Sequence, residues 1–428
     1  MFKYYSLDGN SVERKTDDFH SLTNELYVSA KKLWDYPLPA IIDILSQLGK
    51  KIVINGVAYQ KEGVSYIGMW LRKQNLENII QINYHYPNIS DTYVEVKKDM
   101  YMMAQPRGIV CHWVAANIPS LGVFSIVLSL LSKNASLVKI PPENAEFLCW
   151  VFSHLRGIVC SLNEVEYSGD ILADAIALVS FPGKNLELSS QFSLLADCRV
   201  IYGGGEAVDT ITHLPTKESC DTIVYGPKYS FGMFDRDFVE SPKMEQAISK
   251  CIMDVVTFNQ MACSSPHVYF IEKSSRSIKE VAEMFAASFR KVPDLLLHQG
   301  TPTSIVAGII NKRSYYLLSD DKDAIFPKDA SWTILLDSGP SLEEPVFGKT
   351  VFLKEVGALD EVLDAITHKV QAVTLCVEDK EKRCAIAKEL SYLGVDRVVI
   401  PGTSNEYDQP WDGVLSLSRM VRWTIMKE

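Results

Sequence analysis

One cysteine of this sequence lies in a segment whose neighbours suit a nucleophile. Cys263 stands in the run "NQMACSSPH", Asn259 to His267, between small residues and just before the chain becomes apolar. A thiolate attacks carbonyl carbons, and small neighbours let an acyl group reach the sulfur. The alternative is a buried structural cysteine, the commonest fate of cysteines outside disulfides. His267 also has two interpretations, as a base beside the thiol or as a structural start to a strand.

The elements that must hold such a thiol in place are those of an α/β protein. Residues 108–116, "GIVCHWVAA", form a β-branched apolar run, which predicts a buried strand. Pro119 opens a helical segment that Asn134 closes, and "ASLVKIPP" follows as a second strand. Strand, helix and strand with short joints predict a βαβ unit and hence a parallel sheet. Later strands, among them "DAIALVSFPG" and "CRVIYGGGEA", continue this α/β pattern without a G-x-G-x-x-G fingerprint.

The composition excludes several classes of protein. The chain has 428 residues and a formal net charge of -10, so it lacks the basic surface that nucleic-acid binding requires. Its nine cysteines are scattered without zinc spacing, which predicts no metal site and fits a reducing compartment. The longest apolar run, Leu121 to Ser132, is shorter than the about 20 residues of a membrane span, and the first residues lack a signal peptide's apolar core. We therefore expect a cytoplasmic enzyme of two or three domains or two lobes.

Several segments together carry a resemblance to a known family. In their order and spacing they resemble the aldehyde dehydrogenase superfamily from about Pro106 to Trp411, and within it the LuxC-type acyl-CoA reductases. The "CSSP" and "PWDG" neighbourhoods indicate the LuxC-type branch. The matching segments are "PRGIVCHWVAANIPSLG", "NASLVKIPPE", "VSFPGKN", "VIYGGGEA", "NQMACSSPH" and "YLGVDRVVIPGTSNEYDQPWDG".

The resemblance implies an aldehyde dehydrogenase-like, two-lobed α/β fold with Rossmann-like parallel sheets in both lobes. A cofactor-binding lobe would comprise residues 1–211, and a catalytic lobe with the nucleophilic cysteine would comprise residues 212–404. Residues 405–428 would form a C-terminal tail that returns to the cofactor lobe or makes an oligomer contact. A homo-oligomer is expected on the same grounds.

The resemblance assigns the chemistry to two residues. Cys263 matches the nucleophile, although the Gly-Gln pair that precedes it in many members is absent and Gln260 stands three positions before it. Asn117 matches the amide that donates to the oxyanion, alongside the backbone N–H of Cys263. An Asn before Ile-Pro is otherwise a turn residue, so that interpretation stands beside the functional one.

The resemblance also assigns a nicotinamide cofactor. Lys139 matches the lysine that binds the adenosine ribose. Pro142 stands where strictly NAD-dependent relatives often have a Glu, so NADPH is the expected cofactor. Glu143, the next residue, leaves NADH open as an alternative. Three glycines in loops at strand ends would let the backbone approach the cofactor. A glutamate and a phenylalanine further along resemble the Glu-x-Phe that holds the nicotinamide ribose and ring, although the spacing here is one residue longer. These positions are Gly183, Gly203, Gly204, Glu344 and Phe347. The alternative interpretation is a solvated surface lysine for Lys139 and ordinary loop glycines for Gly183, Gly203 and Gly204.

An absent residue also bears on the reaction. Hydrolytic relatives carry a Glu two residues before a glycine pair, as the base that activates water, and counting back from Gly203 gives Ile201. An apolar side chain cannot activate water, so the acyl-enzyme should wait for hydride.

The expected activity is NAD(P)H-dependent reduction of an activated acyl group, most simply a fatty acyl group, to the aldehyde through an S-acyl-cysteine. The acyl carrier would be CoA, an acyl carrier protein or an acyl-protein synthetase. Two other functions remain open: reduction of an acyl phosphate or CoA-acylating oxidation of an aldehyde, and a non-redox subunit that accepts acyl groups or scaffolds a synthetase. Chain length, carrier, pathway and direction are not fixed by the sequence.

Overall fold

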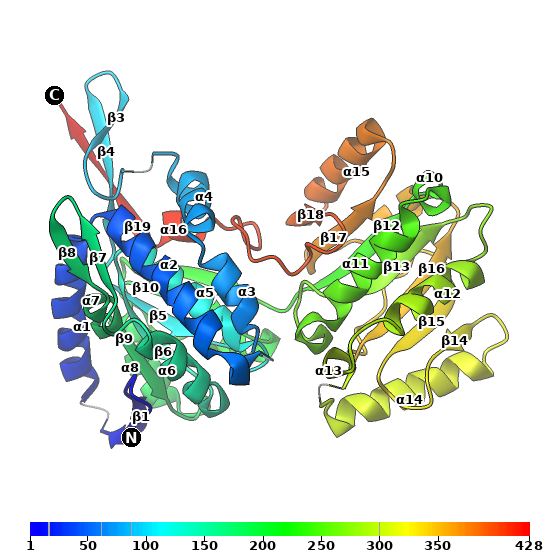
Figure 1. The fold of residues 1–428 in the computed structure, drawn as a ribbon, viewed down its shortest axis with the longest axis horizontal. Coiled ribbons are helices and arrows are strands. Elements are labelled where there is room, and N and C mark those ends of the chain that lie inside the picture. The colour runs from blue at the N-terminus through cyan, green and yellow to red at the C-terminus, as the bar shows by residue number, and fades with distance from the viewer. Residues whose placement is uncertain (16–17, 61, 87, 299) are drawn as a thin grey trace. The chain divides into compact units, whose positions relative to one another are not determined.

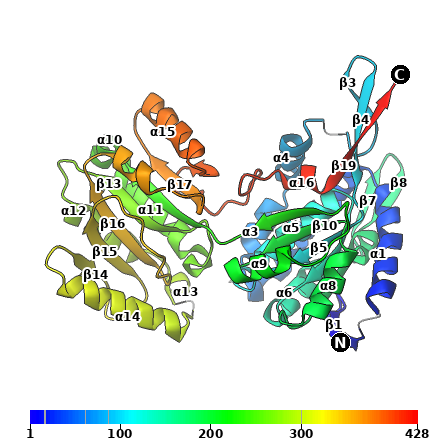
Figure 2. The same ribbon diagram turned by 180° about the vertical axis from the view of Figure 1, so that it is seen from behind.

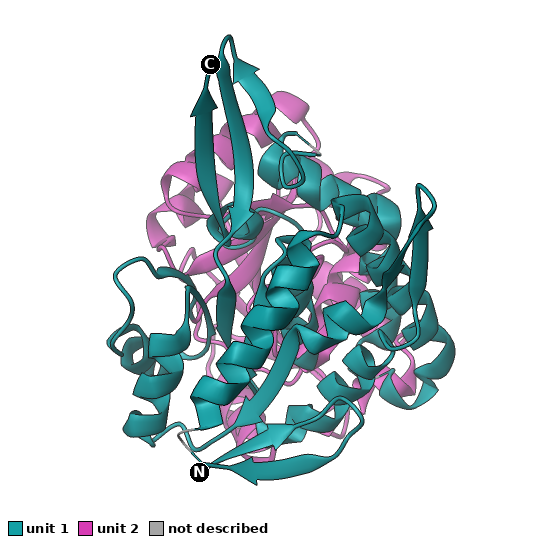
Figure 3. Ribbon diagram, turned by 90° about the vertical axis from the view of Figure 1, so that its left-hand side faces the viewer, with its two compact units in different colours: residues 1–226, 407–428 teal, residues 227–406 magenta. Residues whose placement is uncertain are grey.

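The chain forms two compact units (Figure 3). The computed structural model describes residues 1–428 except 16–17, 61, 87 and 299. Unit 1 comprises residues 1–226 and 407–428, and unit 2 comprises residues 227–406. Each unit is built on its own seven-stranded sheet with helices around it (Figures 1 and 2), so the predicted α/β class is confirmed.

Unit 1 is organised around a sheet in the order β11-β10-β5-β6-β9-β1-β2. The strands from β11 to β9 run parallel, and β1 and β2 extend the sheet in antiparallel fashion. The strands are β1 (Phe2–Tyr5), β2 (Ser11–Arg14), β5 (Ile109–Trp113), β6 (Ala135–Lys139), β9 (Ile176–Ser180), β10 (Cys198–Tyr202) and β11 (Asp221–Tyr225). The predicted βαβ unit is therefore β5, α5 (Pro119–Leu131) and β6.

Smaller elements complete unit 1. A three-stranded sheet holds β3 (Val94–Lys97), β4 (Met100–Pro106) and β19 (Val421–Lys427), and β7 (Val159–Leu162) pairs with β8 (Val165–Ser168). The remaining helices are α1 (Asp18–Trp34), α2 (Leu38–Asn55), η1 (Val57–Tyr59), α3 (Val64–Trp70), α4 (Lys73–Tyr84), η2 (Pro142–Asn144), α6 (Ala145–Ser153), α7 (Gly169–Asp174), α8 (Leu186–Leu195), α9 (Gly205–Thr212) and α16 (Ser416–Arg419).

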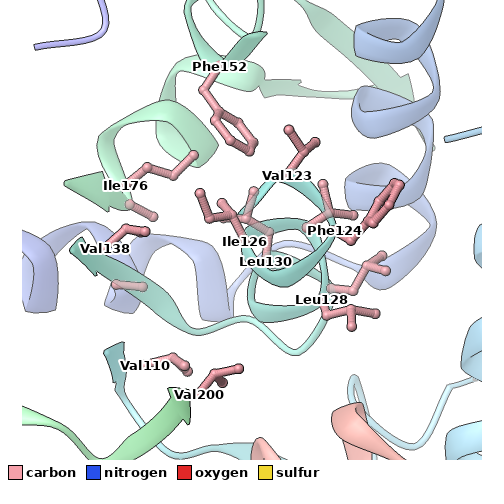
Figure 4. Close-up of a cluster of buried hydrophobic side chains, with 14 of the residues drawn as sticks. Val110, Val123, Phe124, Ile126, Leu128, Leu130, Val138, Phe152, Ile176 and Val200 are labelled. Carbon is pink, nitrogen blue, oxygen red and sulfur yellow. The ribbon is translucent and has the colours of Figure 1, made fainter. Parts of the chain in front are cut away.

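Helix α5 is buried on nearly every side because its sequence is apolar all round. Figure 4 shows Val123, Ile126 and Leu130 of this helix among side chains from strands β5, β6, β9 and β10. Each such side chain contributes about 1.5–3 kcal/mol when fully buried. Cys111 follows Val110 in β5 and therefore points to the other face, where its Sγ donates to the Phe192 carbonyl of α8. Helices thus cover both faces of the sheet.

Unit 2 repeats this plan with the order β14-β15-β16-β13-β12-β17-β18. All neighbours are parallel except β14 and β15. The strands are β12 (Tyr229–Phe234), β13 (Pro266–Glu272), β14 (Asp323–Ile325), β15 (Thr333–Ser338), β16 (Thr350–Val356), β17 (Val370–Cys376) and β18 (Arg397–Val399). The helices are α10 (Arg236–Glu240), α11 (Met244–Val256), η3 (Thr257–Gln260), α12 (Ile278–Phe289), α13 (Asp294–Leu297), α14 (Thr303–Leu318), η4 (Leu359–Ala365) and α15 (Lys380–Tyr392).

The boundaries of the units follow from strand pairing. Unit 1 continues beyond residue 211 because β11 pairs with β10 in the same sheet. Residues 407–428 also belong to unit 1, where β19 pairs with β4 along its whole length. Within the described part of the chain, no helix combines the length and the apolar character needed to cross a membrane. The same residues contain no cluster of three or more His, Cys, Asp or Glu side chains suited to a metal ion.

Candidate active site

Cys263 lies in a loop of unit 2 that joins η3 to strand β13. Just before this loop, Phe258, Asn259 and Gln260 have φ values of 54°, 54° and 61°. Residues other than glycine rarely adopt this left-handed conformation, and each costs of order 1–3 kcal/mol unless its surroundings enforce it. Three in succession therefore indicate that contacts elsewhere hold the start of the nucleophile loop.

Gln260 supplies these contacts from a fully buried side chain. Its Nε2 donates to the carbonyls of Pro266 and Thr350 at 3.1 and 2.9 Å, and its Oε1 accepts from the Thr350 N–H at 2.9 Å. The first of these bonds joins the two ends of the nucleophile loop, residues 261–265. The other two fasten the loop to the start of β16.

A second left-handed run faces the first. Phe347, Gly348 and Lys349 have φ values of 65°, 61° and 62°, and the Lys349 ammonium donates to the Asn259 side-chain oxygen. Lys349 is fully buried. Because burial disfavours the charged form, the pKa of Lys349 falls from 10.5 to about 8.

This lysine gives a prediction for stability. Between about pH 8 and 10.5 the unfolded chain binds more protons at this position than the folded chain, so the free energy of unfolding should rise with pH through that window. Lys349→Met should remove this part of the slope, as measured by urea unfolding at a series of pH values. Lys250→Met, at an exposed position, is the control and should leave the slope unchanged. Equal slopes for wild type and Lys349→Met would contradict the assignment.

The backbone of Cys263 is held in place by a hydrogen bond to its carbonyl. The Ser230 hydroxyl donates to the Cys263 carbonyl at 2.8 Å and accepts from the Ala372 N–H at 3.2 Å, so β12 and β17 both support the loop. Cys263 is half-buried, whereas six of the other cysteines are buried, Cys220 is half-buried and Cys384 is exposed. Cys263 is therefore partly accessible to solvent, while β12 and β17 hold the backbone of its loop.

His267 belongs to strand β13 and is only 2 % exposed. Burial lowers the pKa of its imidazole to about 3, so the ring is neutral at physiological pH. Its ring packs edge-on against Phe347, with 5.2 Å between the ring centres. These features favour the strand interpretation over a role as base.

Asn117 lies in unit 1, in the short connection between β5 and α5. It is exposed and stands two residues before Pro119, which begins the helix. The side chain of Asn144, which is buried, donates to the carbonyls of Ala115 and Ala116 at 3.2 and 3.4 Å. The segment that carries Asn117 is thus fixed by a side chain from the end of η2.

Two of the predicted cofactor residues of unit 1, Lys139 and Gly183, line one cavity of about 540 Å³. It lies at the carboxyl ends of the parallel strands, where ligands bind in open α/β sheets. Lys139 ends β6 and lines it, as do Gly183 beyond β9 and Glu206 in the first turn of α9. Burial lowers the pKa of the Lys139 ammonium, which lies 5.2 Å from the ring centre of Phe181.

The glycines around this cavity leave space open. A Cβ atom added at Gly183 or Gly204 would meet no other atom within 4 Å, so packing does not require glycine at either position. Gly203 and Gly204 directly precede α9, whose Glu206 and Ala207 line the cavity. Open space beside a glycine lets a ligand come close to the backbone.

Glu344 and Phe347 lie elsewhere, in unit 2. Glu344 lines a separate cavity of about 500 Å³ beside α14, with Ile305, Lys312 and Val346. Phe347 contacts His267 and belongs to the left-handed run described above. The two residues are close in sequence but have different surroundings.

Comparison with known proteins identifies the family. The family model described as Acyl-CoA reductase (LuxC) matches residues 44–423. The chain belongs to this family. It is similar to the "Long-chain acyl-protein thioester reductase" of Aliivibrio fischeri, with 24% identity over 356 residues, 80% of this chain and 68% of that protein. The protein of the same name from Vibrio harveyi is 23% identical over 435 residues, 96% of this chain and 87% of the relative.

Solved structures show the same fold. Aldehyde dehydrogenase 21 from Physcomitrella patens superposes with a TM-score of 0.71 at 12% identity, covering 100% of this chain and 95% of that one. A benzaldehyde dehydrogenase from Corynebacterium glutamicum gives 0.68 at 12% identity, with 100% and 95% coverage. The predicted aldehyde dehydrogenase-like fold and LuxC-type family are therefore confirmed, and with them the class of aldehyde-forming acyl reductases.

Ile201, the position counted back from the glycine pair, lies in the core of unit 1 in this LuxC-family structure. Ile201 is fully buried in β10, with its backbone paired to Trp113 on one side and Val224 on the other. A side chain at this position is part of the core, so its apolar character says nothing about whether water can be activated.

Several supporting residues were missed by the sequence analysis. They are Asn144, Ser230 and Lys349, together with Lys184, which lines the unit 1 cavity, and Asn405, whose Oδ1 accepts from the Ser264 hydroxyl at 2.7 Å. Lys184 directly follows Gly183, so it lies in the "VSFPGKN" loop that the sequence analysis had already proposed to contact the cofactor. The others act through partners distant in sequence, and no local pattern marks them.

Proposed function

We propose that the chain reduces a fatty acyl thioester to the aldehyde through an S-acyl intermediate on Cys263. The observation that carries the proposal is the half-buried Cys263 in a loop clamped by Gln260 and Ser230, within a chain of the LuxC family. The relatives named long-chain acyl-protein thioester reductases support a long acyl chain.

The reaction begins when the Cys263 thiolate attacks the thioester carbon. The carbonyl oxygen then carries negative charge, and the Asn117 side-chain N–H donates to it together with the backbone N–H of Cys263. Expulsion of the carrier thiolate leaves the acyl group on Cys263. A nicotinamide cofactor, when bound, supplies the hydride that reduces this group. Collapse of the resulting thiohemiacetal returns the Cys263 thiolate and releases the aldehyde.

The residues of the unit 1 cavity fit a phosphorylated dinucleotide. Its position at the strand ends is typical of nucleotide sites, and Gly183 and Gly204 leave room for backbone approach. Lys139 and Lys184 provide two cations along the same wall, which favours NADPH because its 2′-phosphate adds negative charge. Glu206 is the acidic residue of this wall and is suited to accept from a ribose hydroxyl. Glu344 and Phe347 remain proposed contacts of the nicotinamide ribose and ring.

The carrier and the assembly are also proposals. A partner acyl-protein synthetase is consistent with relatives named acyl-protein thioester reductases, and acyl-CoA or an acyl carrier protein would present the same thioester. The β3–β4–β19 sheet is proposed as the contact of a homo-oligomer, since Trp423 and Ile425 of β19 are exposed.

The activity is tested by incubating the purified chain with a fatty acyl-CoA and NADPH, following cofactor oxidation and aldehyde formation together. Equal amounts of oxidised cofactor and aldehyde support the proposal. Faster turnover of an acyl phosphate would favour the acyl-phosphate reductase. Acylation of Cys263 without binding of NADPH or NADH would favour the non-redox acceptor.

The same assay tests the cofactor assignment. Lys184→Ala should raise the KM for NADPH about tenfold, because a hydrogen bond to a charged group is worth about 1.5–3 kcal/mol, and should leave the KM for NADH nearly unchanged. Lys139→Ala should raise both KM values, since its proposed partner is the ribose that both cofactors share. Lys273→Ala, in unit 2, is the control. An equal rise for both cofactors in Lys184→Ala would rule out a contact with the 2′-phosphate.

A further inference from the structure

The C-terminal signature "PGTSNEYDQPWDG", which begins at Pro401, has no role in the chemistry proposed above. Its first part follows β18 in unit 2 and lies against the nucleophile loop. The Arg397 guanidinium shapes this part by donating to the carbonyls of Ser404 and Glu406 at 3.0 and 2.9 Å. A segment held in this way can serve as a rigid support for its neighbours.

Asn405 connects the signature to the residue after the nucleophile. Its Oδ1 accepts from the Ser264 hydroxyl at 2.7 Å, and its Nδ2 donates to the Asp254 carbonyl at 2.8 Å. The orientation of this amide is determined by its partners, because a backbone carbonyl can only accept. Asn405 therefore links the last turn of α11 to the nucleophile loop through one side chain.

Neighbouring contacts reinforce this link. The Ser404 hydroxyl donates to the Ser264 carbonyl, and the Gly402 N–H donates to the Asp254 carboxyl group at 2.8 Å. Asp254 is only 3 % exposed, and burial raises the pKa of its carboxyl group to about 7. Together with Ser230 on the Cys263 carbonyl, these bonds fix the carbonyls of both Cys263 and Ser264.

Small side chains explain why such bonds are needed. Ala262 and Ser264 on either side of the nucleophile leave space for an acyl group, but they offer little packing surface to hold the loop. Ordering a backbone residue costs about 1–2 kcal/mol, which hydrogen bonds from outside the loop must offset. Reaction rates depend strongly on orientation of the attacking atom, so a loop fixed before the substrate arrives has a kinetic advantage.

We propose that Asn405 is a positioning residue for acyl transfer: by holding the Ser264 side chain, it fixes the backbone on the carboxyl side of Cys263 and orients the sulfur toward the acyl carbon. This inference rests on the proposed function of Cys263. The first part of the C-terminal signature thereby has a role, which is to support the nucleophile loop.

A double-mutant cycle tests the proposal through the single-turnover rate of Cys263 acylation by a fatty acyl-CoA. Asn405→Ala and Ser264→Ala should each lower this rate about tenfold, the worth of one hydrogen bond of about 1.4 kcal/mol. Asn405→Ala also removes the bonds to Asp254 and Ser265, so the double variant should be no slower than Asn405→Ala alone, because the Ser264 bond is already lost in it. Alkylation of Cys263 by iodoacetamide, a small reagent that needs no docked orientation, should change less than about twofold.

Thr403→Ala is the matched control, because Thr403 lies in the same segment and its hydroxyl donates to the Ile400 carbonyl at 2.9 Å instead. It should acylate at the wild-type rate. Additive losses in the double variant, or a parallel fall in acylation and alkylation, would overturn the positioning role. If Asn405→Ala does not fold, a wild-type acylation rate in Ser264→Ala overturns it equally.

The outcome separates the two levels of inference. A wild-type chain that is never acylated on Cys263 contradicts the proposed function and this inference with it. A wild-type chain that is acylated, with Asn405→Ala acylated at the same rate, contradicts only the role of Asn405.

Discussion

Replacing Cys263 with serine is expected to abolish acyl-enzyme formation and to lower kcat/KM for a fatty acyl-CoA at least about a thousandfold. A serine hydroxyl stays protonated where a cysteine thiol ionises, and none of the described side chains is identified as a base that would activate it; His267 is buried and neutral. The loop itself should persist, because Ser230 and Gln260 hold its backbone and not its sulfur. The intact mass after incubation with acyl-CoA in the absence of cofactor measures the acyl-enzyme directly.

Two other cysteines that are not fully buried provide controls for Cys263. Cys220 is also half-buried, but burial raises the pKa of its thiol and its Sγ donates to the Asp221 carbonyl at 3.3 Å. Cys384 is exposed on α15. Cys220→Ser and Cys384→Ser should keep wild-type turnover and the mass increase. An acyl group that remains on the chain in Cys263→Ser would show that another residue is the nucleophile.

The fold was predictable because its signals are local. The apolar runs of β5 and β6 and the helix that begins at Pro119 appear in the sequence within a few residues of their observed bounds. Side-chain periodicity and helix punctuation depend on neighbours only three or four positions away. The position of Lys139 at a strand end followed from the same pattern, and in the structure this residue lines the unit 1 cavity.

The support of the nucleophile was not predictable in this way. Ser230 and Asn405 reach the loop from distant parts of unit 2, and the left-handed conformation of Phe258 is imposed by contacts and not by its own preference. Parallel sheets bring such residues together only after the whole unit has formed. The burial of Ile201 was not predictable for a related reason, since counting from glycines does not reveal that a position is buried within a central strand.

Asn117→Ala is expected to lower kcat for fatty acyl-CoA reduction about 10²–10³-fold, with a much smaller change in the KM for acyl-CoA. The amide is proposed to donate to an oxygen that becomes negative only as the thiolate attacks, so its loss should fall on the transition state and not on substrate binding. The residue is exposed, and the Asn144 side chain donates to the two preceding carbonyls, so the fold of unit 1 should be retained. Single-turnover acylation, followed by rapid quenching, measures the affected step.

Asn117→Asp distinguishes the oxyanion role from the turn interpretation. Aspartate serves as well as asparagine in turns, so a purely conformational Asn117 would tolerate this change. A carboxylate cannot donate and repels a developing oxyanion, so the proposed role predicts a loss at least as large as that of Asn117→Ala. Asn78→Ala, at an exposed position of α4, is the control and should be fully active. Near wild-type acylation by Asn117→Asp would therefore assign Asn117 to the turn and require another donor for the oxyanion.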